Sequence, residues 1–300
     1  MLIKLTTASS MEKNLTYNQI VKKIKNLEIQ GAQKIAVAAV KAFEMKLKKT
    51  KNKKELKKYF NELKGLRATE PALRNALSYC FNNYEKKPHV AKEVLKFFKE
   101  SKEKIAEYGA KKIHDGMIVF THCHSSTVEA VILKAKKQGK KFKVYNTETR
   151  PKFQGRITAK ILSKAGIPVE HFVDSAGRKM LRKVDLFLFG CDAITSEGKL
   201  INKIGTEMLA QAAQDFRIPA YSCTNSWKFN AETIYGFEEE IEERDPKEVW
   251  EKPPKGVKIH NPAFEITAPD VFTGVITELG IFKPETLVAI IKDAYPWMLK

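Results

Sequence analysis

The chain has 300 residues, with 54 Lys and Arg against 35 Asp and Glu and a net charge of +19, which is enough for one large or two modest domains. It contains no run of eighteen apolar residues, so we expect no membrane span, and the stretch 1–14 is too short and broken for a signal peptide. The four cysteines are scattered without a C-x-x-C pair, which predicts a reducing, cytoplasmic location.

The positive charge is concentrated in one part of the chain. Residues 1–115 carry 27 Lys and Arg against 12 Asp and Glu, whereas residues 116–300 carry 27 against 23. Such a field attracts polyanions or small anionic substrates. We prefer a solvated helix surface to a nucleic-acid site, because the lysines are not interleaved with aromatic residues and few of the basic residues are Arg.

Helical periodicity dominates the first third of the chain, and alternating strands and helices follow it. We expect helices near 16–27, 35–45, 56–63, 71–81 and 90–108, with Thr16 as an N-cap and Pro71 opening a helix. Apolar runs then predict strands at 117–121, 142–147, 168–173, 185–190, 218–222 and 274–277, with helices at 126–138, 155–165 and 205–216. This pattern predicts an α/β fold: an N-terminal helical domain (1–115) followed by a Rossmann-like, doubly wound, mostly parallel sheet domain (116–300).

A polar turn between the first strand and its helix is the strongest candidate for a site. A strand that runs through the turn 121–127 straight into a helix places the turn side chains at the carboxyl edge of the sheet. Cys123 lies in that turn between His122 and His124, a setting that favours the thiolate. The alternative is a small cysteine that only packs. A metal site is disfavoured, because adjacent residues of an extended loop point in opposite directions.

Basic residues follow the second expected strand. Arg150 and Lys152 stand just ahead of a helix start, which makes them a plausible anion clamp. The alternative is a surface ion pair between Glu148 and Arg150 or a neighbour.

Two further strand ends carry polar groups. Asp192 follows the run 185–190, where a carboxylate either works on a ligand or caps the turn 194–198. The segment 202–206 is expected to open a helix with Met208, Leu209 and Ala212 on its inner face, and its Lys203 and Gly205 suit a phosphate. The dinucleotide, P-loop and serine-hydrolase motifs are all missing from the sequence.

These segments together resemble one known family. It unites the alpha, beta and delta subunits of translation initiation factor 2B with methylthioribose-1-phosphate isomerase and archaeal ribose-1,5-bisphosphate isomerase. The likeness runs from about Ile20 to the end of the chain, and the archaeal isomerase is the member it resembles most. Its motifs here are Thr121-His122-Cys123-His124-Ser125, 148–155, Asp192, 202–206 and 261–264, with Lys228-Phe229 and 244–246 favouring the archaeal isomerase.

The resemblance implies a role for each site residue. Cys123 would be the proton acceptor and Asp192 the proton donor, kept protonated by an apolar wall. The residues implied to hold substrate are Ser125, Ser126, Thr127, Asn202, Lys203 and Lys228, with Gln30, Gly31, Ala32, Gln33 and Arg67 reaching it from the helical domain. No cofactor or metal is implied.

The chain departs from the family pattern at two points. The first loop usually reads Arg-Gly-Ala-Gly, whereas this chain has Gln30-Gly31-Ala32-Gln33, and Arg67 is followed by Ala68-Thr69 instead of Pro-Thr. Losing the guanidinium at position 30 would weaken phosphate binding by about 1.5–3 kcal/mol unless another group compensates.

The implied activity is the conversion of ribose 1,5-bisphosphate to ribulose 1,5-bisphosphate in archaeal AMP and nucleoside degradation. The implied partners are a phosphorylated pentose, further copies in a homodimer or a higher oligomer up to a hexamer, and AMP as a candidate activator. Two alternatives stay open. One is a non-catalytic regulator that binds nucleotide or initiation factor 2, and the other is a methylthioribose-1-phosphate isomerase.

Overall fold

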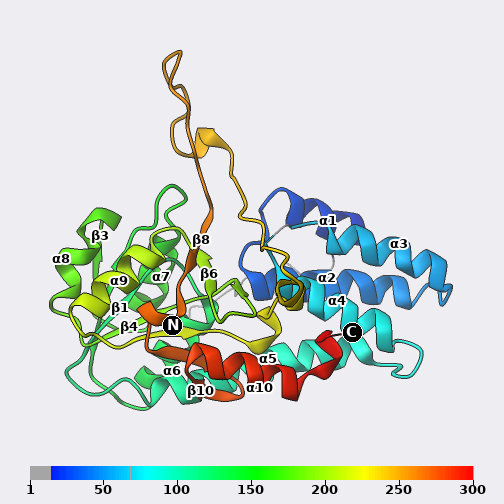
Figure 1. The fold of residues 1–300 in the computed structure, drawn as a ribbon, viewed down its shortest axis with the longest axis horizontal. Coiled ribbons are helices and arrows are strands. Elements are labelled where there is room, and N and C mark those ends of the chain that lie inside the picture. Colours follow the sequence, from blue (N-terminus) through cyan, green and yellow to red (C-terminus); the bar gives the residue numbers. More distant parts are fainter. Residues whose placement is uncertain (1–14, 68, 300) are drawn as a thin grey trace, which may run out of the picture.

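The computed structural model describes residues 15–67 and 69–299, with a helical bundle at one end and a sheet flanked by helices at the other (Figure 1). The stretch 1–14, for which we expect no signal peptide, lies outside the described residues, as do Ala68 and Lys300. In the described part of the chain, no helix is long and apolar enough to cross a bilayer.

The bundle consists of α1 (Tyr17–Lys25), α2 (Ala32–Leu47), α3 (Lys53–Lys64), α4 (Pro71–Asn83) and α5 (Val90–Ala110). Local signals in the sequence explain where these helices begin. Thr16 and Gln19 form a capping box at α1, and Pro71 occupies the first turn of α4. Leu27, expected on the first helix, lies beyond its end with a positive φ of 60°.

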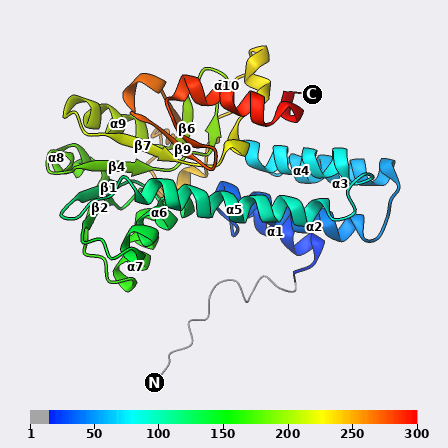
Figure 2. The ribbon, with the colours of Figure 1, turned by 90° about the horizontal axis from the view of Figure 1, so that it is seen from below.

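The main sheet has the strand order β10-β9-β7-β4-β1-β2-β3, in which only β10 runs antiparallel to its neighbour. Its helices α6 and α7 cover one face, and α8 and α9 cover the other (Figure 2). The predicted α/β class with a mostly parallel, doubly wound sheet is therefore confirmed.

The strands of the main sheet are β1 (Ile118–Thr121), β2 (Lys143–Thr147), β3 (Val169–Phe172), β4 (Leu186–Phe189), β7 (Ala220–Cys223), β9 (Gly274–Thr277) and β10 (Gly280–Phe282). The helices are α6 (Ser126–Lys137), α7 (Gln154–Lys164), α8 (Gly177–Leu181), α9 (Thr206–Asp215) and α10 (Pro284–Ala294).

The central strands β1 and β4 are buried on both faces. Val119 and Leu188 contribute to one core cluster, whereas Phe120, Phe187 and Phe189 contribute to another. This alternation places successive side chains of β1 and β4 on opposite faces. It explains why these strands read as continuous apolar runs in the sequence.

A second, antiparallel sheet was not expected from the sequence. It consists of β5 (Ala193–Ile194), β6 (Leu200–Lys203) and β8 (Phe264–Thr267), and it pairs Lys203 with Phe264 and Asn202 with Glu265. The strands are short, so their periodicity gave no signal. Short 3-10 helices complete the structure: η2 (Asp174–Ala176), η3 (Ser226–Lys228), η4 (Ala231–Tyr235), η5 (Pro246–Glu248), η6 (Pro269–Val271) and η7 (Pro296–Leu299).

The helical bundle and the sheet share an apolar core. The ring of Phe97 in α5 stacks on Trp227 in η3 with centroids 4.0 Å apart, and Phe98 meets the same indole at 5.8 Å. The bundle ends at Ala110 and the first strand begins at Ile118. The division into two domains at residue 115 stays a prediction.

Candidate active site

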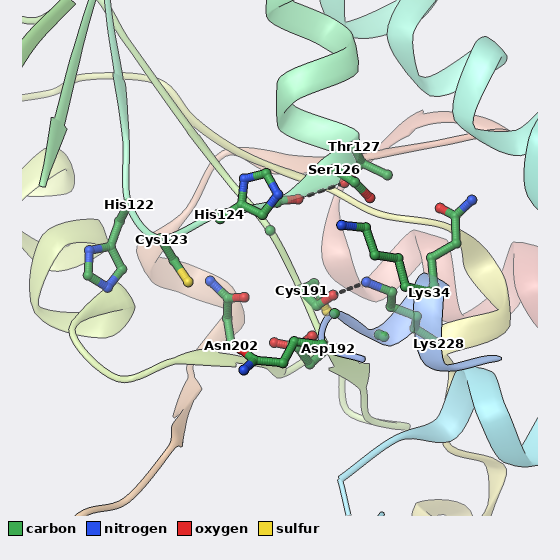
Figure 3. A pocket seen from close by; sticks show the side chains of 16 residues that line it. Lys34, His122, Cys123, His124, Ser126, Thr127, Cys191, Asp192, Asn202 and Lys228 are labelled. Atoms are coloured by element: carbon green, nitrogen blue, oxygen red, sulfur yellow. Dashed lines mark hydrogen bonds between the residues drawn. The ribbon is translucent and has the colours of Figure 1, made fainter. Parts of the chain in front are cut away.

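Two adjoining cavities open where the start of α2 meets the residues that follow β1 and β4 (Figure 3). The larger cavity has a volume of about 420 Å³ and the smaller one about 60 Å³. The residues that line both are Gln30, Gly31, Lys34, Cys123, His124 and Asp192. The two cavities are therefore compartments of one site.

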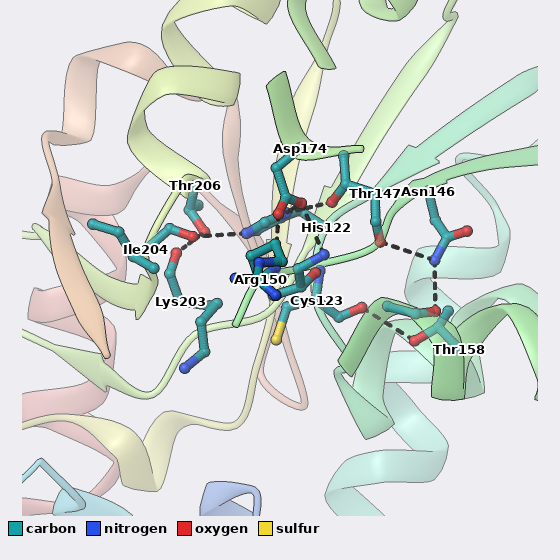
Figure 4. A network of polar contacts seen from close by, with 12 residues as sticks. His122, Cys123, Asn146, Thr147, Arg150, Thr158, Asp174, Lys203, Ile204 and Thr206 are labelled. Carbon is teal, nitrogen blue, oxygen red and sulfur yellow. Dashed lines mark hydrogen bonds and ion pairs between the residues drawn. The ribbon is translucent and has the colours of Figure 1, made fainter. Parts of the chain in front are cut away.

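Cys123 is held in the turn after β1 by its backbone. It adopts a left-handed conformation with a φ of 67°. Its amide donates to Thr149 Oγ1 at 3.0 Å, and its carbonyl accepts from Thr158 Oγ1 at 3.1 Å (Figure 4). Figure 3 shows the sulfur and the Asp192 carboxyl on the same opening, with Asn202 between them in this view. Cys123 is half-buried and lines the cavity, so its thiol can reach a ligand there, and its catalytic role stays a prediction.

The resting thiol is protonated. Burial raises the pKa of Cys123 to about 11, against the opposing effects of the Lys203 charge and a hydrogen bond from the His124 backbone. The expectation that the turn favours a thiolate is therefore wrong for the free protein. Desolvation penalises the charged form more than the helix N-terminus stabilises it.

The two imidazoles beside Cys123 are neutral and structural. His122 bridges Thr147 Oγ1 at 2.6 Å and the Ile204 carbonyl at 2.9 Å, and its burial lowers its pKa (Figure 4). His124 meets Thr158 Oγ1 at 3.1 Å, and burial lowers its pKa to about 4. Neither ring supplies a positive charge to the thiol. Within residues 15–67 and 69–299, no cluster of three or more His, Cys, Asp and Glu side chains is arranged to hold a metal ion.

Asp192 and the pair Asn202-Lys203 reach the cavities from the second sheet. The Asp192 amide donates to the Ile201 carbonyl at 2.7 Å, which ties it to β6. Asn202 and Lys203 are the last two residues of that strand, and both are buried. They were predicted to open a helix, but α9 begins only at Thr206, where the Thr206 hydroxyl accepts from Asn202 Nδ2 at 2.8 Å.

The start of α9 does not form the phosphate site that we expected there. The Glu207 amide in its first turn donates to Glu265 Oε1 at 2.8 Å, so a carboxylate from β8 already occupies this helix N-terminus. Gly205 lines neither cavity. Met208, expected on the inner face, is 53% exposed. The prediction of an anion at this helix start is wrong.

Instead, the N-termini of α2 and α6 converge on the smaller cavity. Gly31 is the N-cap residue of α2 and makes no side-chain cap, so the first N–H groups of this helix have no side-chain partner there. Ser125 caps α6 with a 3.4 Å bond from the Val128 amide. Lys34 and Lys228 line the same cavity. Two helix N-termini and two ammonium groups make this compartment a place where an anion fits.

Two arginines line the larger cavity. The Arg67 guanidinium pairs with Glu242 at 2.5 Å, and Arg244 lies 3.7 Å from Glu242 and 3.6 Å from Glu248. The Arg67 and Arg244 side chains are 6% and 7% exposed. Arg244 Nη2 is buried without a hydrogen-bond partner. This end of the cavity is therefore a second place where an anion fits.

Arg150 and Lys152 do not form the predicted anion clamp. Arg150 is exposed, contacts the Val249 carbonyl at 3.4 Å and lies over the Phe153 ring. Lys152 pairs with Glu248 at 2.9 Å. Neither residue lines either cavity. The alternative of surface ion pairs fits this segment better.

The structure brings the other predicted residues together around the two cavities: Gln30, Gly31, Ala32, Gln33, Arg67, Cys123, Ser125, Ser126, Thr127, Asp192, Asn202, Lys203 and Lys228. Sequence reasoning did not single out three charged residues that line them, namely Glu28, Lys34 and Glu70, and it named Arg244 only within the motif 244–246. Lys34 directly follows the loop 30–33 and Glu70 directly follows the segment 67–69. Their closeness in sequence to these predicted site segments could have indicated them. The motif 244–246 did not indicate that Arg244 reaches the cavity, because this residue approaches from a loop far along the chain.

Comparison with known proteins identifies the family of this chain. Residues 28–284 match the model of the initiation factor 2 subunit family. The chain belongs to this family. The resemblance inferred from the motifs is thereby confirmed.

Within the initiation factor 2 subunit family, the chain is similar to proteins named ribose 1,5-bisphosphate isomerase. The relative from Thermococcus kodakarensis is 39% identical over 310 residues, which cover 94% of this chain and 95% of that protein. The relative from Methanocaldococcus jannaschii is also 39% identical and covers 93% and 95%. We therefore assign the chain to the isomerase enzymes of the family.

Solved structures of family members share the fold. A translation initiation factor eIF-2B from Pyrococcus horikoshii OT3 has a TM-score of 0.80 at 28% identity, covering 91% of this chain and 98% of that one. The 5-methylthioribose 1-phosphate isomerase from the same organism has a TM-score of 0.73 at 26% identity, covering 93% and 88%. Factors and isomerases of the family thus share one architecture, and the side chains in the cavities must distinguish them.

Proposed function

We propose that the protein converts ribose 1,5-bisphosphate to ribulose 1,5-bisphosphate. The observation that carries this proposal is the pairing of the Cys123 thiol and the Asp192 carboxyl on one site that has a cationic corner at either end. A proton acceptor and a proton donor facing a common ligand are what an aldose–ketose isomerisation requires. The names of the relatives support the same substrate.

The proposed reaction moves protons between the substrate and these two side chains. Asp192 gives a proton to the ring oxygen as the bond between C1 and that oxygen breaks. The Cys123 thiolate removes the proton from C2, and the electron pair of that C–H bond forms the C1–C2 double bond of the enol. Cys123 then returns its proton to C1, while Asp192 takes the proton of the 2-hydroxyl group, which becomes the ketone.

The thiol must first lose its proton to solvent for this step, because burial raises the pKa of Cys123 to about 11 in the free protein. Lys203 lines the larger cavity beside Cys123 and opposes that rise through its charge. We therefore infer that Lys203 supports the thiolate when substrate fills the site. A free thiol that resists ionisation is also protected from oxidation and alkylation.

The two anion corners match the two ends of a sugar bisphosphate. One phosphate would lie against the N-termini of α2 and α6 with Lys34 and Lys228, and the other against Arg67 and Arg244. The amide of Gln30 donates to the Leu27 carbonyl at 2.7 Å, so it is engaged within its own loop. The unpartnered Nη2 of Arg244 is the group that compensates for the guanidinium absent at position 30.

An assay of purified protein with ribose 1,5-bisphosphate, and separately with methylthioribose 1-phosphate, tests the proposal. We expect ribulose 1,5-bisphosphate as product and a loss of about 10²–10⁴-fold in kcat/KM for Cys123→Ser and Asp192→Asn. Asp215→Asn, at an exposed carboxyl paired with Arg178, is the control. Turnover of methylthioribose 1-phosphate alone would assign the other isomerase activity. Capture of initiation factor 2 without any turnover would assign the regulatory role.

We also infer that the protein is a homo-oligomer. An arm formed by residues 249–260 projects from the body (Figure 1), and it exposes Val249, Trp250 and Val257. Apolar side chains on such an arm are covered when a second copy packs on it. Light scattering tests this, and the mass of Trp250→Ser should be lower than that of the wild type.

A homodimer, a hexamer, activation by AMP, a role in AMP degradation and a cytoplasmic location stay predictions from the sequence.

A further inference from the structure

Glu70 places an unpartnered carboxyl in the larger cavity. It is 2% exposed and holds the N-cap position of α4, but its side chain does not cap that helix. Its Oε2 atom is buried without a hydrogen-bond partner. It lines the larger cavity together with Cys123 and Asp192. Burying an ionised carboxylate without a partner is costly, so the group has to be neutral or to serve a ligand.

The charged groups that act on Glu70 are Asp192, Glu242, Arg67 and Lys228, and Lys34, Lys203 and Arg244 line the same cavity. The two cations whose charges act on the Glu70 carboxyl each have another partner. Arg67 pairs with Glu242, and Lys228 Nζ donates to the Cys191 carbonyl. Burial, followed by the charge of Asp192, raises the pKa of Glu70 to about 8, although Arg67 and Lys228 oppose this rise. At neutral pH the Glu70 carboxyl is therefore mostly protonated.

We propose that Glu70 is a second acid of this active site: it supplies the proton that Asp192 gives to the ring oxygen, and it is protonated again when Asp192 has accepted the proton of the 2-hydroxyl group. This inference rests on the proposed isomerase function. Two carboxyls in one enclosed site do not both ionise readily, so the charge of Asp192 favours the protonated form of Glu70. A protonated carboxyl is also a hydrogen-bond donor, which an ionised one is not.

The proton balance of this step closes within the site. The O–H bond of Glu70 breaks as an O–H bond forms on Asp192, and Asp192 passes that proton to the ring oxygen of the sugar. The pair then recovers one proton from the 2-hydroxyl group when that carbon becomes the ketone. No acid other than these two carboxyls is needed, and no electrons leave or enter the substrate.

The first test measures the proton on Glu70 without any assay of activity. A carboxyl whose folded pKa is raised binds more protons in the folded state, so its stabilising contribution is present below the unfolded pKa and is lost as pH rises to about 8. We expect the melting temperature of the wild type to fall over this range and that of Glu70→Gln to fall less. Parallel curves for the two proteins would show that Glu70 carries no proton and would overturn the inference.

The second test measures kcat/KM against pH for the wild type, Glu70→Gln, Glu70→Asp and the control Glu278→Gln. Glu278 is also buried, but it bonds to Ser226 and lines neither cavity. In the wild type, in Glu70→Asp and in the control, we expect a break near pH 8, which is the pH at which kcat/KM begins to fall. In Glu70→Gln the break moves at least one unit lower and the rate at pH 8 falls about tenfold, since one pKa unit is a factor of ten.

The outcomes separate this inference from the proposed function. A slower Glu70→Gln enzyme with an unmoved break would mean that Glu70 only shapes the cavity, and it would overturn the inference alone. A wild type with no isomerase activity would overturn the proposed function, and the role of Glu70 with it. A shifted break in Glu70→Gln, restored by Glu70→Asp, supports both.

Discussion

Lys203 and Cys123 line the same cavity, and the charge of Lys203 opposes the burial that raises the pKa of the Cys123 thiol. Lys203 is 8% exposed at the end of β6, and its Nζ lies 4.8 Å from the centroid of the Phe264 ring. The second sheet thus holds this ammonium group in place. The ionisation of the thiol therefore depends on a residue that lies far from Cys123 in sequence.

The first prediction concerns Lys203→Met, which removes this charge. The pKa of Cys123 should rise further, and each unit of rise slows alkylation by iodoacetamide at pH 8 about tenfold. We expect kcat/KM to fall in parallel. Lys199→Met is the matched control, because Lys199 is half exposed and pairs with Glu197. Equal alkylation rates in Lys203→Met and the wild type would contradict the role of Lys203.

The second prediction concerns Arg244→Met. A charge-assisted hydrogen bond to a phosphate contributes about 1.5–3 kcal/mol, so KM for ribose 1,5-bisphosphate should rise about 10- to 100-fold with a smaller change in kcat. Steady-state kinetics measure both constants. Arg178→Met, at an exposed residue paired with Asp215, should leave KM unchanged. A fall in kcat with constant KM would place Arg244 elsewhere in the mechanism.

The third prediction concerns His124 and acid stability. Burial lowers its pKa to about 4 from a usual value near 6.5, so the unfolded chain takes up this proton before the folded protein does. The stability that the neutral ring contributes is therefore full above about pH 6.5 and is lost as pH falls towards 4. Thermal melts should show a weaker pH dependence in this window for His124→Asn than for the wild type. His114→Asn, at an exposed histidine, should follow the wild type.

The fourth prediction concerns Gly155, where α7 begins close against the end of β2. A Cβ at this position would lie 1.7 Å from the Thr147 carbonyl oxygen, and a backbone atom cannot give way as a side chain can. Gly155→Ala should lower the free energy of unfolding by about 3 kcal/mol or more. Urea unfolding measures this loss. In Gly65→Ala the nearest atom is 3.5 Å from the new Cβ, so a similar loss there would argue against the steric cause.

Local signals in the sequence were sufficient for much of the fold. The periodicity of apolar residues predicted the helices of the bundle and the six strands β1, β2, β3, β4, β7 and β9, and Thr16 and Pro71 marked helix starts that the structure retains. The turn around Cys123 was also found from its neighbours alone. These features depend on residues within one or two turns of each other, and such contacts can be read from a short window.

Only the tertiary structure decided the chemistry of the cavities. The antiparallel pairing of β6 with β8 put Lys203 beside Cys123 and Glu265 on the start of α9, and the fold kept Arg150 away while it brought Arg244 and Glu70 in. The protonation of Cys123 and Glu70 follows from how completely each group is removed from water. Desolvation and contacts between distant segments leave no pattern in the local sequence, so they can be identified only in the folded structure.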